Sequence, residues 1–349
     1  MSDTSSSASQ TVLLTGATGF IGLHCAVRLL EEGYRVRGTI RSASKEEDLR
    51  ATIRRHAESD DRLEVVLADL SSDDGWREAA EGCTYALHVA SPLPRTPPKD
   101  ENEIIVPARE GALRVLRACS EAGVRRVVMT SSMAAILYGN DRSQIFDESS
   151  WSNVESPKIG AYEKSKTLAE RAAWEFVEGL ADERESPMEL VVINPGIVFG
   201  PILSSDWGTS GEAIKKLMQR DVPACPPIGW APVDVRDVAD AHLAAMTAPG
   251  VAGERFVCAI EHVWLRDVAL ILDRHFRDRG YKIPTGKLPA WVMRAMAIFD
   301  RTAALALNDL GVRQDVDNSK IKRLLDWQPR GLEEMVVTMG ESLIEYGVV

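Results

Sequence analysis

The N-terminal part of the sequence contains three glycines spaced three residues apart, a pattern that strongly constrains the local fold. They stand at positions 16, 19 and 22 in TGATGFIG. An apolar run, residues 11–14, precedes them, and an amphipathic run, residues 22–32, follows. The glycines therefore lie in a turn between a strand and a helix. The first would permit a tight turn, the second would let the backbone approach a pyrophosphate, and the third would let the helix pack closely on the strand.

Such a turn suits a dinucleotide, because the free amides and the positive dipole end of the following helix face the phosphates. The spacing Gly-x-x-Gly-x-x-Gly differs from the commonest Gly-x-Gly-x-x-Gly fingerprint, and a glycine-rich turn can also serve only as a tight corner. Its position directly after the first strand favours the nucleotide interpretation. The residues predicted to contact the dinucleotide here are Gly16, Thr18, Gly19, Phe20, Ile21 and Gly22.

Apolar runs alternate with amphipathic runs over the first 200 residues. This alternation predicts strands buried on both faces and separated by helices, which is typical of an α/β fold with a doubly wound parallel sheet of the Rossmann type. The predicted strands are 11–14, 35–40, 63–68, 85–89, 126–130 and 190–193, and the predicted helices are 22–32, 45–56, 76–81, 104–122 and 161–180.

After about residue 200 the alternation weakens, and loop-rich stretches precede predicted helices at 235–248, 265–277, 289–310 and 332–346. We expect a disordered tail over residues 1–10 and a dinucleotide-binding domain with the catalytic residues over 11–200. Residues 201–349 are expected to form a smaller, mainly helical, substrate-binding cap, from which residues 232–260 return to the first domain.

The charge of the chain limits its partners. Its 349 residues include 41 Lys and Arg against 52 Asp and Glu, and the formal net charge is −11. A nucleic acid or an anionic membrane would require a basic face, so we expect a small-molecule partner instead. The five cysteines are scattered and never form Cys-x-x-Cys, which argues against a metal site and favours a reducing compartment. Without an apolar run that could span a bilayer, the chain is predicted to be cytoplasmic, as a monomer or a homodimer.

The end of the second predicted strand distinguishes the two nicotinamide dinucleotides. An acidic residue there would hold the ribose 2′-hydroxyl of NAD, whereas a cation accommodates the 2′-phosphate of NADP. Arg41 and Lys45 follow this strand, with no acidic residue before Glu46, which favours NADP(H); a solvated charge is the plainer alternative for Arg41. Asp69 could bond the adenine or only organise a turn. The other predicted contacts at strand ends are Leu70, Ala90 and Ser91.

A Tyr-x-x-x-Lys pair lies on the predicted helix 161–180. Tyr162 and Lys166 are four residues apart and share one helix face. The ordinary pKa of tyrosine, about 10, is too high for proton exchange at neutral pH. A nearby ammonium would lower this pKa and produce a proton donor for a carbonyl–alcohol pair. Ser131 or Ser132, at the end of strand 126–130, offers a hydroxyl to polarise the carbonyl oxygen.

Together these segments resemble the extended short-chain dehydrogenases/reductases of the NAD-dependent epimerase/dehydratase superfamily. They are most similar to the dihydroflavonol reductase, cinnamoyl-CoA reductase and fungal aldehyde/ketone reductase group. The similar stretches are TGATGFIG, TIRS, HVASP, VVMTSSMAAI, YEKSKTLAE, NPGIVFGP and VDVRDVADAHLAAM. The resemblance implies that Tyr162 is the catalytic acid, that Lys166 bonds the nicotinamide ribose, and that Ser132 orients the carbonyl. Near the nicotinamide, the predicted cofactor contacts are Pro195, Gly196 and Val198.

We therefore predict an NADPH-dependent reductase that converts an aldehyde or ketone into the alcohol, with hydride from the nicotinamide and a proton from Tyr162. The alternatives are a sugar-nucleotide epimerase of the same fold and a non-catalytic, NADP-sensing regulator. Flavonoid-reducing relatives carry a polar residue a few places after the catalytic serine, but residues 135–138 are mostly apolar. A medium-sized, largely apolar substrate is therefore expected.

The predicted substrate pocket is bounded by residues 91–93, residues 136–138 and Phe199. Few cations near it could hold a sugar diphosphate: Arg95 and Lys99 lie in a proline-rich loop, and Arg236 is expected to pair with Asp237 or Asp240. His88 lies within an apolar strand and is expected to be a buried core histidine rather than a ligand.

Overall fold

A seven-stranded sheet forms the centre of the computed structural model, which describes residues 10–92, 100–140, 144–183, 187–297 and 307–349. Its strand order is β10-β6-β5-β4-β1-β2-β3, and all neighbouring strands are parallel. The predicted Rossmann-type sheet is thus confirmed. The strands are β1 (Thr11–Thr15), β2 (Arg35–Ile40), β3 (Leu63–Leu67), β4 (Tyr85–His88), β5 (Arg126–Thr130), β6 (Glu189–Pro195) and β10 (Arg255–Cys258).

The strand order reverses next to β1. The chain moves from β1 outward through β2 to β3, then returns to β4 on the other side of β1 and continues outward through β5 and β6. In a doubly wound sheet, this reversal leaves a crevice at the carboxyl ends of the two central strands, where ligands bind. The glycine turn follows β1, and residues 89–92 follow β4, so both lie at this crevice.

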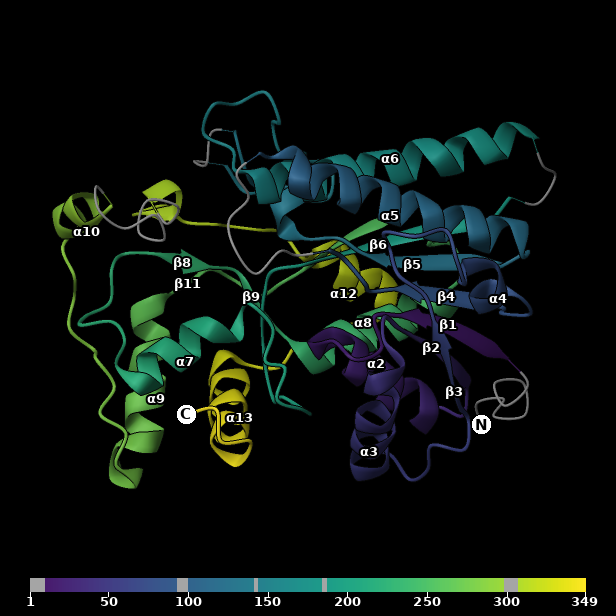
Figure 1. Ribbon diagram of the computed structural model, residues 1–349. Helices are drawn as coiled ribbons and strands as arrows, with labels where there is room; N and C mark the ends of the chain where they lie inside the picture. The colour runs from purple at the N-terminus through teal and green to yellow at the C-terminus, as the bar shows by residue number, and fades with distance from the viewer. Residues whose placement is uncertain (1–9, 93–99, 141–143, 184–186, 298–306) are drawn as a thin grey trace.

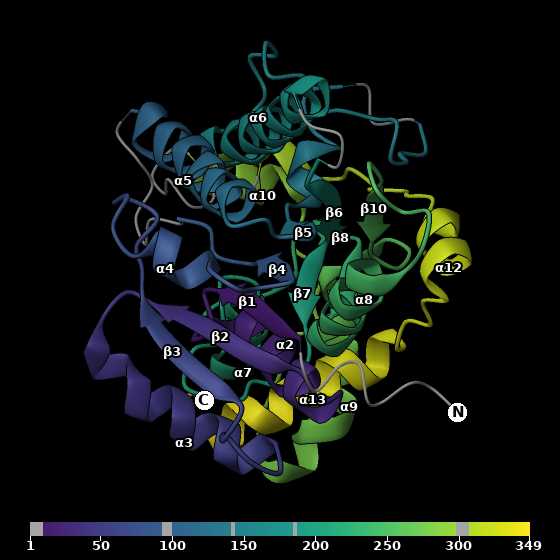
Figure 2. The ribbon, with the colours of Figure 1, turned by 90° about the vertical axis from the view of Figure 1, so that its right-hand side faces the viewer.

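Helices cover both faces of the sheet (Figure 1). On one face α5 (Asn102–Glu121) and α6 (Ala161–Glu183) pack along each other, and on the other face α2 (Phe20–Glu31) packs against α8 (Val235–Thr247). Figure 2 shows the same three layers after a quarter turn. The remaining elements of this part are α3 (Glu46–His56), α4 (Trp76–Ala80) and the 3₁₀ turns η1 (Ala43–Lys45) and η2 (Met133–Ala135).

Most elements after residue 195 lie beyond the edge at which the strands end (Figure 1). In this region β7 and β9 form a parallel pair, and β8 and β11 form an antiparallel pair. The helix α13 packs against α7 and α9. The elements are β7 (Ile197–Phe199), α7 (Gly211–Gln219), β8 (Gly229–Trp230), β9 (Pro232–Asp234), β11 (Val263–Trp264), α9 (Leu265–Phe276), η3 (Arg277–Arg279), α10 (Ala290–Met296), η4 (Leu307–Asp309), α12 (Ser319–Leu325) and α13 (Leu332–Glu345). In contrast, β10 and α8 join the central sheet and its helical layer.

The prediction of one helix over 289–310 is wrong. The helix α10 ends at Met296, a 3₁₀ turn occupies Leu307–Asp309, and residues 298–306 lie outside the described ranges. Within α10 only Met293 is buried, and Trp291 is 70% exposed, so packing does little to extend this helix. The predicted tail also lies outside the described residues, except for Gln10. Within the described ranges, no helix is both long and apolar enough to cross a bilayer.

Candidate active site

The glycine turn after β1 has the geometry that its sequence requires. Gly16 adopts a φ of +70°, a left-handed conformation that favours glycine. A Cβ on Gly22 would lie 2.0 Å from the Gly16 backbone oxygen, so only glycine lets α2 approach the turn this closely. Among the described residues, a Cβ on Gly19 would have one neighbouring atom within 4 Å. This atom is the Gly16 backbone oxygen, at 3.5 Å. Packing within the protein thus explains two of the three glycines, and the space beside Gly19 accommodates an incoming ligand.

The start of α2 suits a phosphate. Gly19 is its N-cap, no side chain in the described structure caps it, and its first turn contains no acidic residue. Amide groups at such a helix start attract anions through their N–H bonds and the helix dipole. Phe20 is 8% exposed and packs in the core, and Ile21 packs against the same core. The Phe20 side chain is therefore occupied by packing, which leaves its backbone for the predicted contact, and Thr18 is half-buried beside it.

The cations predicted to bind the 2′-phosphate lie at the surface after β2. Arg41 and Lys45 are both exposed, and Lys45 lies 3.3 Å from the exposed Asp48. Asp69 organises the turn after β3, since its Oδ1 accepts hydrogen bonds from the Ser71 amide at 2.8 Å and the Ser71 hydroxyl at 2.7 Å. These bonds, together with the charge of Arg41, lower the pKa of Asp69. The turn-forming interpretation of Asp69 therefore holds in this structure.

The two candidate serines after β5 face different partners. The Ser131 hydroxyl donates to the buried carboxylate of Glu170. The Ser132 hydroxyl instead accepts a 3.1 Å hydrogen bond from the Ala134 amide, and it interacts with the Tyr162 phenol, whose pKa it lowers. This geometry distinguishes the two serines and favours Ser132 as the partner of Tyr162.

Lys166 lies near Tyr162 but does not lower its pKa. Desolvation by the surrounding protein raises the pKa of Tyr162, against the lowering effect of Ser132, although the residue is 37% exposed. The predicted lowering of this pKa by Lys166 is therefore not found in this structure. The Lys166 Nζ lies 5.9 Å from the centroid of the Tyr162 ring and donates to the Ser91 hydroxyl at 2.9 Å. Burial also lowers the pKa of Lys166 to about 8. At neutral pH the phenol is therefore protonated and the lysine remains mostly charged.

The other predicted cofactor residues lie at the ends of the central strands. The Ala90 amide donates to Thr15 Oγ1 at 3.0 Å, and Ala90 packs on Gly16. A Cβ on Gly196 would lie 1.8 Å from the Ala231 oxygen, so close backbone packing already accounts for this glycine. Leu70 is half-buried beside Gly111. The two remaining residues, Pro195 and Val198, are buried.

The predicted substrate pocket is wrong in three positions. Ile136, Leu137 and Phe199 are between 0% and 1% exposed and pack in hydrophobic clusters, so they form the core rather than a pocket surface. Tyr138 is half-buried, as is Pro92. The third residue of the segment 91–93 is outside the described ranges, as are Arg95 and Lys99.

Arg236 pairs with other carboxylates than those predicted. Its guanidinium lies 2.7 Å from Asp234 and 3.1 Å from Glu334, whereas Asp237 and Asp240 both face Arg330. The Asp234 side chain is completely buried and caps the start of α8. From this position it pairs with Arg236, which lies in the first turn of the same helix.

His88 is a buried core histidine, as predicted. Its Nδ1 lies 2.9 Å from the Thr15 hydroxyl, and its residue is 3% exposed. Burial lowers its pKa to about 3, so the ring is neutral. Because Thr15 also contacts Ala90, this histidine connects the ends of β1 and β4.

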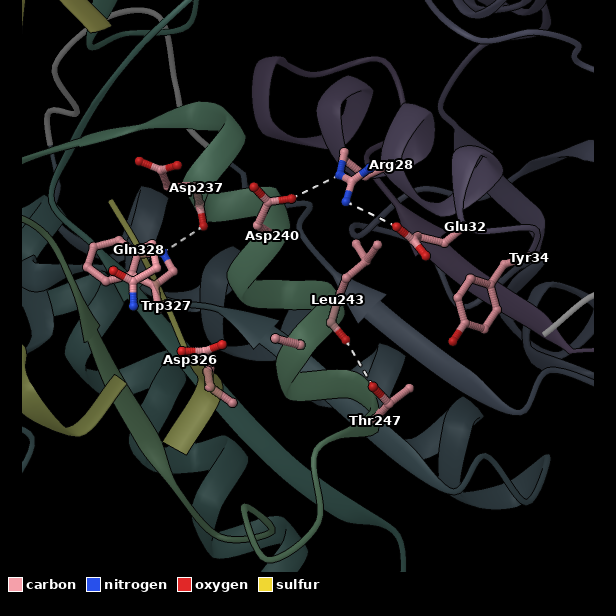
Figure 3. A pocket seen from close by; sticks show the side chains of 12 residues that line it. Arg28, Glu32, Tyr34, Asp237, Asp240, Leu243, Thr247, Asp326, Trp327 and Gln328 are labelled. Atoms are coloured by element: carbon pink, nitrogen blue, oxygen red, sulfur yellow. Dashed lines mark hydrogen bonds and ion pairs between the residues drawn. The ribbon is translucent and has the colours of Figure 1, made fainter. Parts of the chain in front are cut away.

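A groove of about 440 Å³ lies elsewhere, between α2, α8 and residues 325–328 (Figure 3). None of the predicted site residues lines it. Arg28 pairs with two carboxylates of the lining, at 2.9 Å from Asp240 and 3.2 Å from Glu32. The predicted cofactor residues and Ser132 instead lie at the carboxyl ends of strands β1 to β6, and Tyr162 and Lys166 lie on the first turns of α6.

The sequence interpretation missed a cluster of buried polar residues behind Ser132. Glu170 lies at its centre and contacts Ser131, Asn194 and Arg255. One signal was available: Glu170 continues the four-residue spacing of Tyr162 and Lys166 along one helix face. Its two partners on β6 and β10 are distant in sequence, and no local pattern indicates them.

Comparison with known proteins identifies the family. The model of the NAD dependent epimerase/dehydratase family matches residues 12–259, which is more than half of the chain. The chain belongs to this family. The resemblance predicted from the sequence motifs is thereby confirmed.

Several reductases of this family are similar to the chain over most of its length. The NADPH-dependent methylglyoxal reductase GRE2 of Saccharomyces cerevisiae is 31% identical over 357 residues, covering 96% of this chain and 98% of that protein. Cinnamoyl-CoA reductase 1 of Petunia hybrida is 36% identical over 280 residues, covering 79% of this chain and 80% of that protein. The crystal structure of yeast methylglyoxal/isovaleraldehyde reductase Gre2 complexed with NADPH has a TM-score of 0.79 and 30% identity, and the alignment covers 97% of this chain and 100% of that chain.

These similarities confirm the enzyme class as well as the fold. This member of the epimerase/dehydratase family is an NADP(H)-dependent oxidoreductase that acts on carbonyl or alcohol groups. The substrates named for these similar proteins differ, since one is a cinnamoyl-CoA reductase and another is a methylglyoxal reductase.

Proposed function

We propose that this protein reduces an aldehyde or ketone to the alcohol with NADPH, and that Ser132, Tyr162 and Lys166 are the catalytic residues. The observation that carries the proposal is the grouping of Ser132 with Tyr162, whose pKa it lowers, and with Lys166, whose Nζ lies 5.9 Å from the Tyr162 ring centroid. Ser132 lies at the carboxyl end of β5, one strand away from the β1–β4 crevice, where a doubly wound sheet binds its dinucleotide.

The cofactor residues that we propose fit a bound NADP(H). The amides at the start of α2 and the space beside Gly19 would take the pyrophosphate. Exposed Arg41, with Lys45 nearby, would take the 2′-phosphate by charge-assisted hydrogen bonds. When bound, the reduced nicotinamide supplies a hydride to the carbonyl carbon. Lys166, which donates to Ser91 in this structure, is proposed to donate to the nicotinamide ribose instead.

The chain's own catalytic contribution is the proton. Tyr162 is protonated at neutral pH, since the ordinary pKa of tyrosine is about 10 and desolvation raises it further here, so its phenol can donate to the carbonyl oxygen as the alcohol forms. The Ser132 hydroxyl would donate a hydrogen bond to the same oxygen and hold it within reach of Tyr162.

We further propose a small to medium-sized carbonyl substrate rather than a sugar nucleotide, bound between residues 11–200 and the cap over 201–349. Two observations support this choice. The similar yeast reductase is described as acting on methylglyoxal and isovaleraldehyde, both small carbonyl compounds. In addition, Arg236, a cation that a sugar diphosphate would need, is held by Asp234 and Glu334.

The test is the oxidation of NADPH, followed by its absorbance, with a panel of aldehydes, ketones and UDP-sugars. We expect stoichiometric oxidation with aromatic or branched aliphatic carbonyls and no turnover of UDP-sugars. The nucleotide should also be lost on desalting, because a reductase releases NADP⁺ in each cycle. Tightly retained nucleotide together with inactive carbonyl assays would contradict the proposal and favour an epimerase.

A further inference from the structure

The Glu170 carboxylate is the centre of a buried polar cluster behind Ser132. Glu170 is 0% exposed. Its Oε2 accepts hydrogen bonds from the Ser131 hydroxyl and, at 2.8 Å, from Asn194 Nδ2. The same Asn194 nitrogen donates to the Ser132 backbone oxygen at 3.2 Å. A single carboxylate oxygen is thus connected to both serines, to one directly and to the other through Asn194.

The other oxygen of Glu170 faces a buried arginine. Arg255 Nε lies 2.7 Å from Oε1, but its N–H does not point at the oxygen well enough to form a hydrogen bond, so the contact is an ion pair. The ring of Trp151, 3.8 Å from the guanidinium carbon, and the Ser150 oxygen, 2.9 Å from Nη1, hold Arg255 in place. A buried ion pair is by itself weak evidence for a stabilising role, because desolvation opposes the attraction.

We propose that Glu170 is a positioning residue for the carbonyl reduction: it fixes the Ser131–Ser132 backbone and so holds the Ser132 hydroxyl against the Tyr162 phenol. This inference rests on the function proposed above. Glu170 itself touches none of the groups proposed to contact the substrate. Its charge also opposes the lowering of the Lys166 pKa by burial. The same carboxylate therefore supports both the serine and the lysine of the proposed site.

The test removes the charge of Glu170 without leaving Arg255 unpaired. Glu170→Gln keeps the side-chain length, and Arg255→Met removes the partner charge, since an isolated buried charge strongly destabilises a fold. We expect E170Q/R255M to keep the wild-type Tm and NADPH affinity. Its kcat should fall about tenfold to a hundredfold, the loss produced when a catalytic group is misplaced by about 1 Å. A wild-type kcat in this double variant would refute the positioning role.

Two further variants separate positioning from stability. Glu170→Asp keeps the charge but withdraws the carboxylate, so a kcat between those of wild type and E170Q/R255M is expected. Glu189→Gln is the matched control: Glu189 also faces a buried arginine, Arg126, at 2.6 Å, but this pair lies at the opposite end of β5 and β6 from Ser132. We expect E189Q to lower the Tm and to leave kcat unchanged. An equal loss of kcat in E189Q would show that destabilisation alone explains the effect.

Crystal structures of the wild type and of E170Q/R255M provide a readout that does not depend on the reaction. Displacement of Ser132 away from Tyr162 in the double variant would support the inference even if the wild type reduced none of the carbonyls tested, a result that would contradict only the proposed function. Ser132 in its wild-type position would refute the inference.

Discussion

Alanine substitutions at two glycines of the turn should separate its role in the fold from its role in cofactor binding. A Cβ on Gly22 would lie 2.0 Å from the Gly16 oxygen and 2.9 Å from the Gly16 carbonyl carbon. Both atoms belong to the backbone, so no flexible side chain can move aside. In Gly22→Ala, α2 would have to shift by roughly 1 Å in a closely packed interior.

The expected loss of stability follows from two opposing effects. Overpacking of this kind costs typically 1–3 kcal/mol, and contact with backbone places Gly22→Ala near the upper end, at about 3 kcal/mol. Replacing glycine by alanine within a helix stabilises the helix by up to about 1 kcal/mol, which offsets part of this loss. The net loss is therefore about 2 kcal/mol, which for a chain of this length corresponds to a fall in Tm of about 3 °C.

Gly19→Ala should give the opposite result. The backbone angles of Gly19, −81° and 165°, suit alanine, and its Cβ would have an ordinary contact of 3.5 Å. As an N-cap, alanine is inferior to glycine by less than about 1 kcal/mol. The new methyl group would, however, occupy the space proposed for the pyrophosphate. NADPH affinity should then fall at least about tenfold, or 1.4 kcal/mol.

Thermal unfolding without nucleotide and NADPH titration by fluorescence measure the two effects separately. We expect Gly22→Ala to lower the Tm clearly, and Gly19→Ala to weaken NADPH binding with little change in Tm. Normal NADPH binding by Gly19→Ala would show that the pyrophosphate does not lie beside this residue. A wild-type Tm for Gly22→Ala would show that the turn relaxes without cost, against the packing argument.

Three further predictions concern single side chains of the site. Arg41→Asp should raise the KM for NADPH far more than the KM for NADH, because repulsion replaces a charge-assisted contact with the 2′-phosphate. An unchanged ratio of the two KM values would refute the role of Arg41 in binding the 2′-phosphate. Tyr162→Phe should keep NADPH affinity but lower kcat by about 10² to 10⁴, and near-normal turnover would mean that another group protonates the substrate. The kcat/KM of the wild type should decrease as the pH rises through about 8, because Lys166 of the enzyme without bound ligands loses its proton near this pH. The residual activity of Lys166→Arg should not show this decrease, since arginine stays charged. Because the folded chain binds this proton more weakly than the unfolded chain does, the stability of the fold should rise as the pH increases above about 8.

Local features of the fold and site could be predicted because they depend on neighbouring residues in the sequence. The strands Arg35–Ile40 and Arg126–Thr130 have their predicted bounds, and the other four predicted strands are found with ends shifted by one or two residues. The glycine turn was predictable because φ at Gly16 and the close approach at Gly22 are backbone constraints that only glycine satisfies. The spacing of Tyr162 and Lys166 likewise fixes their common helix face.

Features that depend on distant pairing could not be predicted. The strand β10 is only four residues long and pairs with β6, more than 60 residues earlier. The ion pair between Glu170 and Arg255 joins residues 85 positions apart, and nothing near either residue indicates the other. The same is true of Arg236, whose second partner, Glu334, lies on α13.

The division of apolar residues between core and pocket also depends on distant segments, and it limits what an apolar sequence says about the substrate. Ile136 and Leu137 follow the predicted catalytic serine, which made them candidates for a pocket surface. In the structure, Phe146 and Val257 belong to the same buried cluster, so their apolar character is used for folding. Tyr138 stays half-buried because its ring lies at the margin of that cluster. Substrate preference should therefore be tested by substituting partly exposed residues rather than buried ones, and Tyr138 is the first such residue to substitute.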